Sequence, residues 1–550
     1  MSNMTAHRTS EAPQTCRELM RHKQTATICM ILLFGQAGCG GGSGSDIETP
    51  ALPPPIVAPQ PGNPPGGEDA PPVPPLVPTT PPEAIPTPGD TMPAVQVSNA
   101  KQLQNAINNA SAGVVIRLAD GSYTGPFTIT RKNGRSGSPI TIVAANPGGA
   151  VISGKAGFEF ESASYVTLQG LKFVNQGTAV SLSSASHHVR VTGNTFALAK
   201  NSAPTKWIVI DGAGSDYNQI DHNDFGPRQG VGQMIALDQV NEQVPRHTLI
   251  EKNHFHDAVR LADNGGETIR VGLSVASMSD GFTVIQNNLF VHCDSDPEVI
   301  SVKSGRNTVR FNTFIRNQGQ VTARHGHNNS FYGNYLLNDG VKKDVGGFRI
   351  YGNDHKLYNN YLHKLTGNAI VLDAGSYDGG ANGYTSTPNE EQLRMHWRIY
   401  RALVVNNTIV GSTTGIVIGG SKSLAPVGSI VANNIVVNTT GTLYDENMKS
   451  NTVFAGNIGF GATTGNVSRT SAEIRTVDPM LVEVDGLRKL SSNGPAHHAA
   501  VGHYPFLTDD MDGQTRTRHD VGADEYTSLP ALRKPLTAED VGPNATDAGT

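Results

Sequence analysis

The sequence predicts an all-β protein that folds as a right-handed parallel β-helix, with a short N-terminal helix capping one end. Three observations predict this fold class. Short apolar segments with β-type alternation recur along the chain, and most of them end in an asparagine. These asparagines lie 22 to 35 residues apart over most of the chain. Helical periodicity is scarce, while glycine is plentiful at 61 residues, which suits a chain that turns often.

Asparagine marks the same place in ten successive repeats. Gly170-Leu-Lys-Phe opens the series, which then continues at Asn194, Asn223, Asn253, Asn288, Asn312, Asn334, Asn360, Asn407, Asn434 and Asn457. Stacked asparagines at a bend can hydrogen-bond the backbone of neighbouring coils, and each coil buries its inward side chains only against its neighbours. A β-propeller would need about 40 residues per blade, so a solenoid is the better prediction.

Two departures from the repeat are expected. A helix is predicted from Asn99 to Ala110, where apolar residues recur at helical spacing and Ser98 can serve as the N-cap. Such a helix would cover the open edge of the first coil. The gap of 47 residues between Asn360 and Asn407 must hold an insertion, and we expect its polar, glycine-rich stretch to lie over the substrate groove.

The chain is divided into four predicted parts: a signal peptide at 1–39, a Gly/Ser/Pro-rich disordered tether at 40–93, the β-helix at 94–527 and a disordered tail at 528–550. The signal ends in a lipoprotein-like box at Cys39, and Met20 is a possible later start. We therefore expect an exported protein, held by a lipid on Cys39 at the outer membrane and facing the periplasm or the cell surface, or otherwise periplasmic or secreted. Cys293 is then the one cysteine left in the β-helix, so no disulfide framework is possible.

The distribution of charge favours an anionic substrate. The formal net charge of −5 gives no sign of a nucleic-acid binder, and we expect a monomer that binds an anionic substrate. Between residues 301 and 356, however, nine lysines and arginines stand against three aspartates. A solvated charged face is the plainer interpretation of such a stretch.

The chemistry-bearing residues are concentrated in two short segments, 294–304 and 323–326. Lys303 and Arg324 are 21 residues apart, close to the local coil length, so they can occupy neighbouring coils on one face as potential base and acid. Asn264, Asp296 and Glu298 offer hard oxygen ligands of the kind that Ca²⁺ prefers. Glu298 and Lys303 have opposite strand parity, so a bend near Pro297 is required. Alternatively, the two carboxylates simply pair with nearby Arg or Lys.

Four ordered blocks resemble the signatures of polysaccharide lyase family 6, which comprises alginate lyases and chondroitinase B-type dermatan sulfate lyases. They are Asn264-Gly-Gly-Glu-Thr-Ile-Arg-Val-Gly272, Asp296-Pro-Glu-Val-Ile-Ser-Val-Lys-Ser304, Arg324-His-Gly326 and Gly346-Gly-Phe-Arg-Ile-Tyr-Gly-Asn-Asp-His355. The resemblance implies a parallel β-helix and Ca²⁺-assisted β-elimination at uronic acids. It assigns Asn264, Asp296 and Glu298 as calcium ligands, Lys303 as base, Arg324 as acid, and Arg270, His325, Arg349 and His355 as substrate contacts. Asp296 departs from the glutamate that is usual in the family.

The sequence-based hypothesis is therefore a lyase that cleaves alginate and leaves a 4,5-unsaturated uronate end. Dermatan sulfate or chondroitin is the alternative substrate. A β-helix glycoside hydrolase would need paired acids and no essential lysine, and its products would lack the ultraviolet chromophore. A non-catalytic polysaccharide-binding solenoid would not need Lys303 and Arg324 one coil apart.

Overall fold

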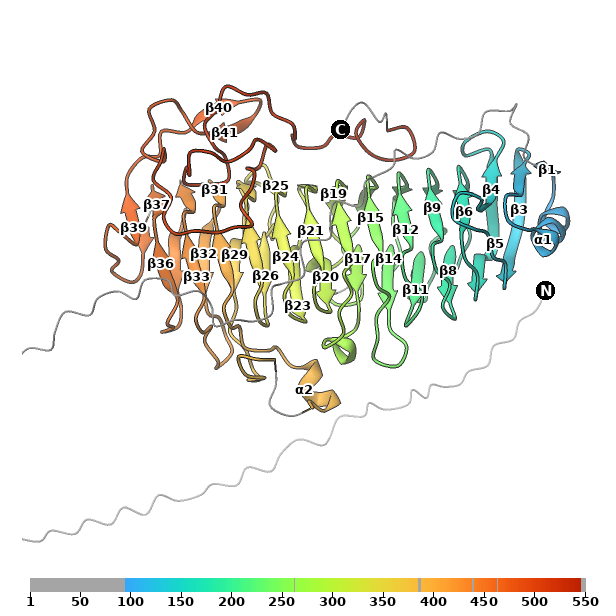
Figure 1. The fold of residues 1–550 in the computed structure, drawn as a ribbon, viewed down its shortest axis with the longest axis horizontal. Coiled ribbons are helices and arrows are strands. Elements are labelled where there is room, and N and C mark those ends of the chain that lie inside the picture. The colour runs from blue at the N-terminus through green and yellow to red at the C-terminus, as the bar shows by residue number, and fades with distance from the viewer. Residues whose placement is uncertain (1–93, 262, 384–386, 438–439, 462, 546–550) are drawn as a thin grey trace, which may run out of the picture. The chain divides into compact units, whose positions relative to one another are not determined.

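A computed structural model describes residues 94–545, apart from positions 262, 384–386, 438–439 and 462. The predicted signal peptide and tether lie outside the described residues. The described part belongs to one compact unit and forms a parallel β-helix (Figure 1), which confirms the predicted fold class. Within it, helices are too short or too polar to cross a membrane.

Three faces of parallel strands make up the β-helix, and most coils contribute one strand to each face. The first face contains β1 (Ala94–Val97), β2 (Val115–Leu118), β4 (Ile140–Ala144), β6 (Val166–Gln169), β9 (Arg190–Thr192), β12 (Gln219–Asp221), β15 (Leu249–Glu251), β18 (Val284–Gln286), β21 (Thr308–Arg310), β24 (Ser330–Tyr332), β27 (Lys356–Tyr358), β30 (Leu403–Val405), β33 (Ile430–Ala432) and β36 (Val453–Ala455).

The second face begins directly after the asparagine of each coil. It contains β7 (Lys172–Phe173), β10 (Thr195–Phe196), β13 (Asp224–Phe225), β16 (His254–Ala258), β19 (Leu289–Cys293), β22 (Thr313–Ile315), β25 (Tyr335–Leu337), β28 (Tyr361–His363), β31 (Thr408–Val410), β34 (Ile435–Val437), β37 (Asn457–Phe460) and β39 (Ile474–Thr476).

The third face completes each coil. It contains β8 (Val180–Ser183), β11 (Ile208–Asp211), β14 (Ile235–Asp238), β17 (Ile269–Val271), β20 (Glu298–Lys303), β23 (Gln320–His325), β26 (Phe348–Ile350), β29 (Asn368–Leu372), β32 (Thr414–Ile418), β35 (Thr442–Glu446) and β38 (Thr463–Gly465). The long strands β3 (Gly121–Thr130) and β5 (Ala150–Glu161) join the second and third faces, because β5 pairs with both β7 and β8.

The predicted asparagine ladder runs along the corner between the first and second faces. Asn288 is typical: it is fully buried, and its backbone and side-chain N–H groups both donate to Asn312 Oδ1 at 3.0 Å. Asn312 in turn donates to Asn334 Oδ1 from the same two groups at 3.1 Å. The residue before the asparagine has a positive φ, 54° at Asn287, which turns the chain into the next face. The ladder therefore satisfies buried polar groups at the sharpest bend of every coil.

Aromatic rings form a second ladder inside the β-helix, two residues after the asparagines. Successive rings are stacked with centroids 4.6 to 4.9 Å apart from Phe173 through Phe196, Phe225, Phe255, Phe290 and Phe314. Their side chains are buried together with the inward Ile, Val and Leu of all three faces. Each coil thus positions both the asparagine and the aromatic ring of the next coil.

Helix α1 (Ala100–Asn109) caps the N-terminal end, as the sequence predicts, and buries Leu103 and Ile107. Its N-cap is Asn99, whose side chain accepts a hydrogen bond from the N–H of Gln102 at 3.0 Å. The predicted cap, Ser98, instead donates from its backbone and hydroxyl to the Gln102 side chain. The prediction was therefore displaced by one residue, because both side chains suit this turn.

The C-terminal segment, residues 477–545, runs back along the outside of the second face (Figure 1). It contains the antiparallel pair β40 (Val482–Val484) and β41 (Leu487–Lys489). Its backbone N–H groups bond to successively earlier coils: Arg488 to Tyr361 Oη, Leu536 to Thr313 Oγ1 and Gly542 to Lys252 O, each at 2.8 Å. The prediction of a disordered tail from residue 528 was therefore wrong as far as residue 545. These hydrogen bonds involve isolated residues, which form no periodic pattern that could be recognised in the sequence.

The predicted insertion lies between β29 and β30 and carries the short helix α2 (Glu390–Arg394), which has a capping box at Asn389. Figure 1 shows α2 projecting from the body of the β-helix on the side of β20, β23 and β26. It packs beside the 3₁₀ turn η1 (Ser274–Ala276), which follows β17. Two separate loops thus stand beside the third face.

Replacing a ladder asparagine should destabilise the whole coil stack. Asn312→Ala removes the acceptor of two Asn288 N–H groups and the donor to Ile285 O, and leaves these buried groups unpaired. We expect a loss of at least ~2 kcal/mol, seen as a melting temperature lower by several degrees in calorimetry. Asn105→Ala, on the exposed side of α1, is the matched control and should change little. Equal melting temperatures for the two variants would contradict this account of the ladder.

Candidate active site

The outward side of the third face carries a row of polar residues in register. Arg270 on β17 pairs with Ser301 on β20, Ser301 with Thr322 on β23, and Thr322 with Arg349 on β26. Residues in register on parallel strands lie about 4.8 Å apart, so the row places two guanidinium groups three strands apart on one surface. This row is the floor of the candidate site.

Strand β20 contains the bend that the sequence requires. The register shifts between Glu298 and Ile300, and both Val299 and Ile300 are buried in the core. Two consecutive residues therefore point inward, as in a β-bulge. As a result Glu298 lies on the same side as Ser301, whose hydroxyl donates to Glu298 Oε2. The sequence prediction of a bend between residues 297 and 299 is confirmed.

A second bulge separates Lys303 from Arg324. Val302 pairs with Ala323, but Lys303 pairs with His325, so Arg324 is the extra residue of β23. The prediction that Lys303 lies directly beneath Arg324 was therefore wrong by one residue, although both belong to the same site. Lys303 Nζ lies 3.4 Å from Glu267 Oε1, and Arg324 Nη1 lies 3.8 Å from Glu298 Oε1.

Three carboxylates are buried behind these cations. Asp296 is 3% exposed, and its two oxygens accept the N–H groups of Gly266 and Glu298, each at 2.9 Å. Burial, and to a smaller extent the neighbouring Glu267 and Glu298, raises the pKa of Asp296. Burial also favours the neutral acid at Glu267, but Lys303, Gln233 and Arg270 outweigh it and lower the pKa of Glu267. The pair Lys303–Glu267 is thus an ion pair.

The arrangement does not fit calcium as the sequence predicts it. Both oxygens of Asp296 are taken by backbone donors, and Glu298 Oε1 accepts from Arg349 at 2.6 Å. Asn264 is exposed, and the groups of three acidic or histidine side chains that converge within 4.8 Å in the described residues include neither Asp296 nor Glu298. Glu267 faces Lys303, Glu298 faces Arg324 and Arg349, and Asp296 is held by backbone N–H groups, so the oxygens that would bind a metal are already engaged.

The two arginines of the polar row differ in availability. Arg270 is 8% exposed and forms a salt bridge with Asp238, which also pairs with Lys206. The Arg349 side chain is 27% exposed and that of Arg324 is 31% exposed, while both contact Glu298. An anionic ligand can therefore reach Arg324 and Arg349, whereas Arg270 is buried and contacts Asp238 instead.

Neither predicted histidine contact faces the substrate. His355 is fully buried: its Nδ1 accepts from Asn329 N at 3.1 Å and its Nε2–H donates to Tyr351 O at 2.7 Å. It ends a second ladder, in which Thr283 N donates to Asn307 and Asn307 N donates to Asn329. His355 is thus a structural residue, and its assignment as a substrate contact was wrong.

His325 is 2% exposed and lies beneath the site. Burial, together with Arg324, Lys303 and His396, lowers the pKa of His325 well below its usual value, so the ring is neutral. Its centroid lies 6.5 Å from that of His396. We therefore interpret His325 as a residue that supports Arg324 and Lys303 from beneath. Its buried position does not support the predicted direct contact with sugar.

Sequence reasoning missed three residues of the site. Glu267 stands inside a quoted block but was not weighed as the partner of Lys303. Tyr351 lies two residues after Arg349, so strand alternation could have placed it on the same side. Its hydroxyl donates to Asp373, and its ring lies 5.8 Å from the Arg349 guanidinium. His396 comes from the insertion and packs against Tyr351 with centroids 4.4 Å apart, so the insertion does reach the site.

Known proteins resemble this chain in sequence and in fold. A family model described as Chondroitinase B matches residues 97–454. The chain belongs to the chondroitinase B family. This membership confirms the resemblance to polysaccharide lyase family 6 that the four sequence blocks predict. No curated protein matches the chain significantly.

Solved structures share the fold of this chondroitinase B family chain. The PL6 family alginate lyase AlyGC is 24% identical, with a TM-score of 0.63 over 81% of this chain and 60% of AlyGC. A PL6 alginate lyase in complex with a trisaccharide is 23% identical, with a TM-score of 0.63 over 83% and 96% of the two chains. A mannuronic acid specific family 6 lyase from human gut microbiota is 22% identical, with a TM-score of 0.60 over 70% and 91%. The chain thus spans about three fifths of the length of AlyGC.

The buried position of His355 predicts a specific sensitivity to acid. Burial lowers the pKa of His355 to about 4, so between pH 6.5 and 4 the unfolded chain binds a proton that the folded chain refuses. Stability should therefore fall as the pH drops through this window. His355→Asn restores the residue type of the ladder without a titrating ring, so its melting temperature should fall less from pH 6.5 to 4. Parallel curves for the variant and the native chain would contradict the structural role.

Proposed function

We propose that this polysaccharide lyase family member cleaves alginate by β-elimination, with Lys303 as the base. The observation that carries the proposal is the clustering of Lys303, Arg324 and Arg349 on one outward face over buried carboxylates. Of these three side chains, the lysine is the one that can exchange a proton, and the two arginines supply fixed positive charge. Elimination at a uronate needs both.

In the proposed reaction, Lys303 first releases the proton of its ion pair with Glu267 to solvent, and then as the neutral amine takes the proton from C5 of the uronate beside the scissile bond. The electrons of the C5–H bond form the C4=C5 double bond, and the bond between C4 and the glycosidic oxygen breaks. The C5 proton is weakly acidic because the adjacent carboxylate resists further negative charge. Positive groups bound to that carboxylate stabilise the intermediate, which is the largest contribution such a site can make.

Arg324 and Arg349 are the residues that we assign to the uronate carboxylate. Guanidinium groups bind carboxylates through two parallel hydrogen bonds, and both side chains are partly exposed. On substrate binding each could keep its contact with Glu298 and offer its other N–H groups to the uronate. This assignment replaces the calcium predicted from the resemblance, because the carboxylates that would hold calcium are already engaged.

The departing oxygen also needs a proton. A guanidinium hardly releases one, so Arg324 stabilises the charge on the leaving oxygen while a water or a neighbouring hydroxyl supplies the proton. Tyr351 is the hydroxyl of the site: burial and its bond to Asp373 raise its pKa, so it keeps its proton at neutral pH. We therefore propose Arg324 for charge stabilisation and Tyr351 as the second candidate donor.

The substrate class is the finer part of the proposal. The family model carries the description Chondroitinase B, which makes dermatan sulfate the second candidate. Alginate is favoured because several solved structures with this fold are PL6 alginate lyases. We further propose that the protein acts as a monomer and is exported, since an external polysaccharide must be reached outside the cytoplasm.

Removing the base should abolish the lyase reaction without unfolding the protein. Lys303→Ala should lower the rate of ultraviolet absorbance growth on alginate by about 10² to 10⁴-fold, and Arg324→Ala by about 10² to 10³-fold. Lys172→Ala, an exposed lysine in β7, is the control and should keep full activity. The assay should be repeated with dermatan sulfate and pectate.

Four outcomes decide among the alternatives. An increase in absorbance with dermatan sulfate alone would change the substrate assignment to dermatan sulfate and would leave the proposed mechanism unchanged. Reducing ends released without absorbance would identify a hydrolase. Binding without any cleavage, or full activity of Lys303→Ala, would reject the lyase mechanism with this base.

The effect of chelation tests the role of the arginines. Because Asp296 and Glu298 are held by protein donors, we expect the enzyme to keep most of its activity on alginate after exhaustive treatment with EDTA. Arg349→Ala frees Glu298 and should be strongly impaired under both conditions. Loss of native activity in EDTA that Ca²⁺ restores would show instead that the carboxylates rearrange around a metal.

A further inference from the structure

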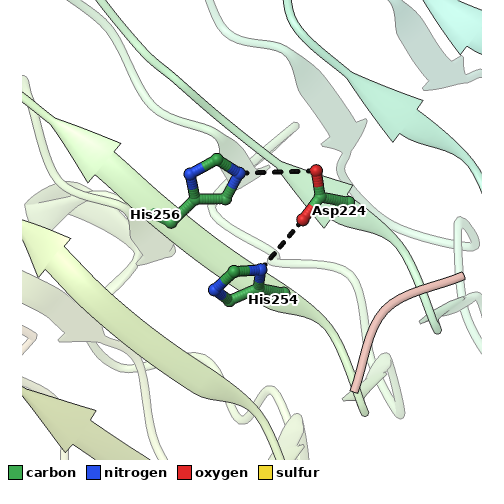
Figure 2. Close-up of side chains that lie close together, drawn as sticks. All are labelled: Asp224, His254 and His256. Atoms are coloured by element: carbon green, nitrogen blue, oxygen red, sulfur yellow. Dashed lines mark hydrogen bonds and ion pairs between the residues drawn. The ribbon is translucent and has the colours of Figure 1, made fainter. Parts of the chain in front are cut away.

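Two histidines and an aspartate converge on the second face, away from the lyase site. Asp224 lies on β13, and His254 and His256 project from the same side of the neighbouring strand β16. Figure 2 shows the two rings turned toward the two oxygens of one carboxylate. His254 Nδ1 lies 2.9 Å from Asp224 Oδ1, and His256 Nε2 lies 3.4 Å from Asp224 Oδ2. One potential ligand atom from each residue lies within 4.8 Å of the other two.

The neighbours of His256 form a second layer around this cluster. Its remaining nitrogen, Nδ1, lies 2.9 Å from Asp257 Oδ2, and His292 Nδ1 lies 3.5 Å from the other oxygen of Asp257. A metal-binding histidine usually donates its second N–H to a carboxylate, which fixes the ring and the tautomer. Asp257 holds His256 in this way, with Nε2 directed to Asp224.

We propose that Asp224, His254 and His256 bind one divalent transition-metal ion of the zinc class. Tetrahedral coordination with bonds of ~2.0 Å separates neighbouring ligand atoms by about 3.3 Å. The two histidine–aspartate distances of 2.9 and 3.4 Å, each to a different oxygen of Asp224, lie on either side of this value, and the ligand atoms of the three residues lie within 4.8 Å of one another. Side-chain movements can therefore close the site around an ion. Two imidazoles select such an ion over Ca²⁺ or Mg²⁺, which prefer oxygen ligands alone.

The site keeps a coordination position open to solvent. The side chains of His254, His256 and Asp224 are 20%, 19% and 27% exposed, so they hold the ion from one side only. A structural zinc site would be closed by a fourth protein ligand, whereas three ligands leave room for water or for an anionic group of a partner molecule. The C-terminal segment borders the site, since Gly542 N donates to Lys252 O two residues before His254.

This site and the proposed lyase site belong to different faces. The three ligands lie on β13 and β16, whereas Lys303, Arg324 and Arg349 lie on β20, β23 and β26 of the third face. Metal binding is therefore independent of the proposed lyase function, and failure of one leaves the other intact.

Calorimetric titration with Zn²⁺ tests the proposal on the full mature chain, purified without a histidine tag and freed of metal by chelation. We expect one equivalent of Zn²⁺ to bind and to raise the melting temperature. Asp224→Asn and His256→Ala should each weaken binding by more than about tenfold, and Asp257→Asn should weaken it by about 10 to 100-fold through the orientation of His256. Asp224→Asn nearly preserves shape, so it separates loss of metal from loss of fold.

The matched control is His503→Ala, which removes an exposed histidine remote in sequence from the cluster and should leave the titration unchanged. Cleavage of alginate by Asp224→Asn should equal that of the native chain. Absence of stoichiometric binding to the native chain would overturn the proposal. Binding that survives both Asp224→Asn and His256→Ala would overturn it as well, because it would then come from surface histidines elsewhere.

Discussion

The hydrogen bond from one asparagine to the next is the interaction on which the rest of the structure depends. Asn288, Asn312 and Asn334 each satisfy the backbone N–H of the preceding coil and their own buried amide at the same corner. This bond fixes where each coil turns, and so fixes which residues of the next strands point outward. A one-residue slip at the corner would turn the outward row of the third face into the core.

The active-site face uses this fixed register and departs from it at two bulges. An undistorted β20 would point Glu298 inward, and an undistorted β23 would pair Lys303 with Arg324. The bulge at Val299 brings Glu298 to the surface beside Ser301, and the bulge at Arg324 pairs Lys303 with His325 instead. Bulges next to active sites commonly re-aim side chains in this way. The ladder holds the flanking corners, so the irregularity stays confined to one face.

The fold, and the nearness of Lys303 to Arg324, could be predicted from the sequence, because both depend on periodicity. Ten asparagines at coil spacing define the solenoid, and Lys303 and Arg324 follow at nearly one coil. The bulge at Arg324 could not be predicted, since a spacing of 21 rather than 22 residues is within the variation of the coils. His355 illustrates the opposite error. It stands 26 residues after Asn329, a ladder interval, yet its place in a family-like block suggested a substrate contact. Glu267 was missed because contact with Lys303 links residues 36 apart across a loop.

The balance of charge in the site explains why arginine, rather than lysine, contacts Glu298. Burying Glu267, Asp296 and Glu298 requires compensation, which Lys303, Arg324 and Arg349 provide. A guanidinium has five donors, so Arg349 can keep one bond to Glu298 while it offers others to a uronate. Lys303 contacts one carboxylate and its side chain is 12% exposed, which suits a base that accepts one proton from the substrate. Binding and proton transfer are thus assigned to different cations by their geometry.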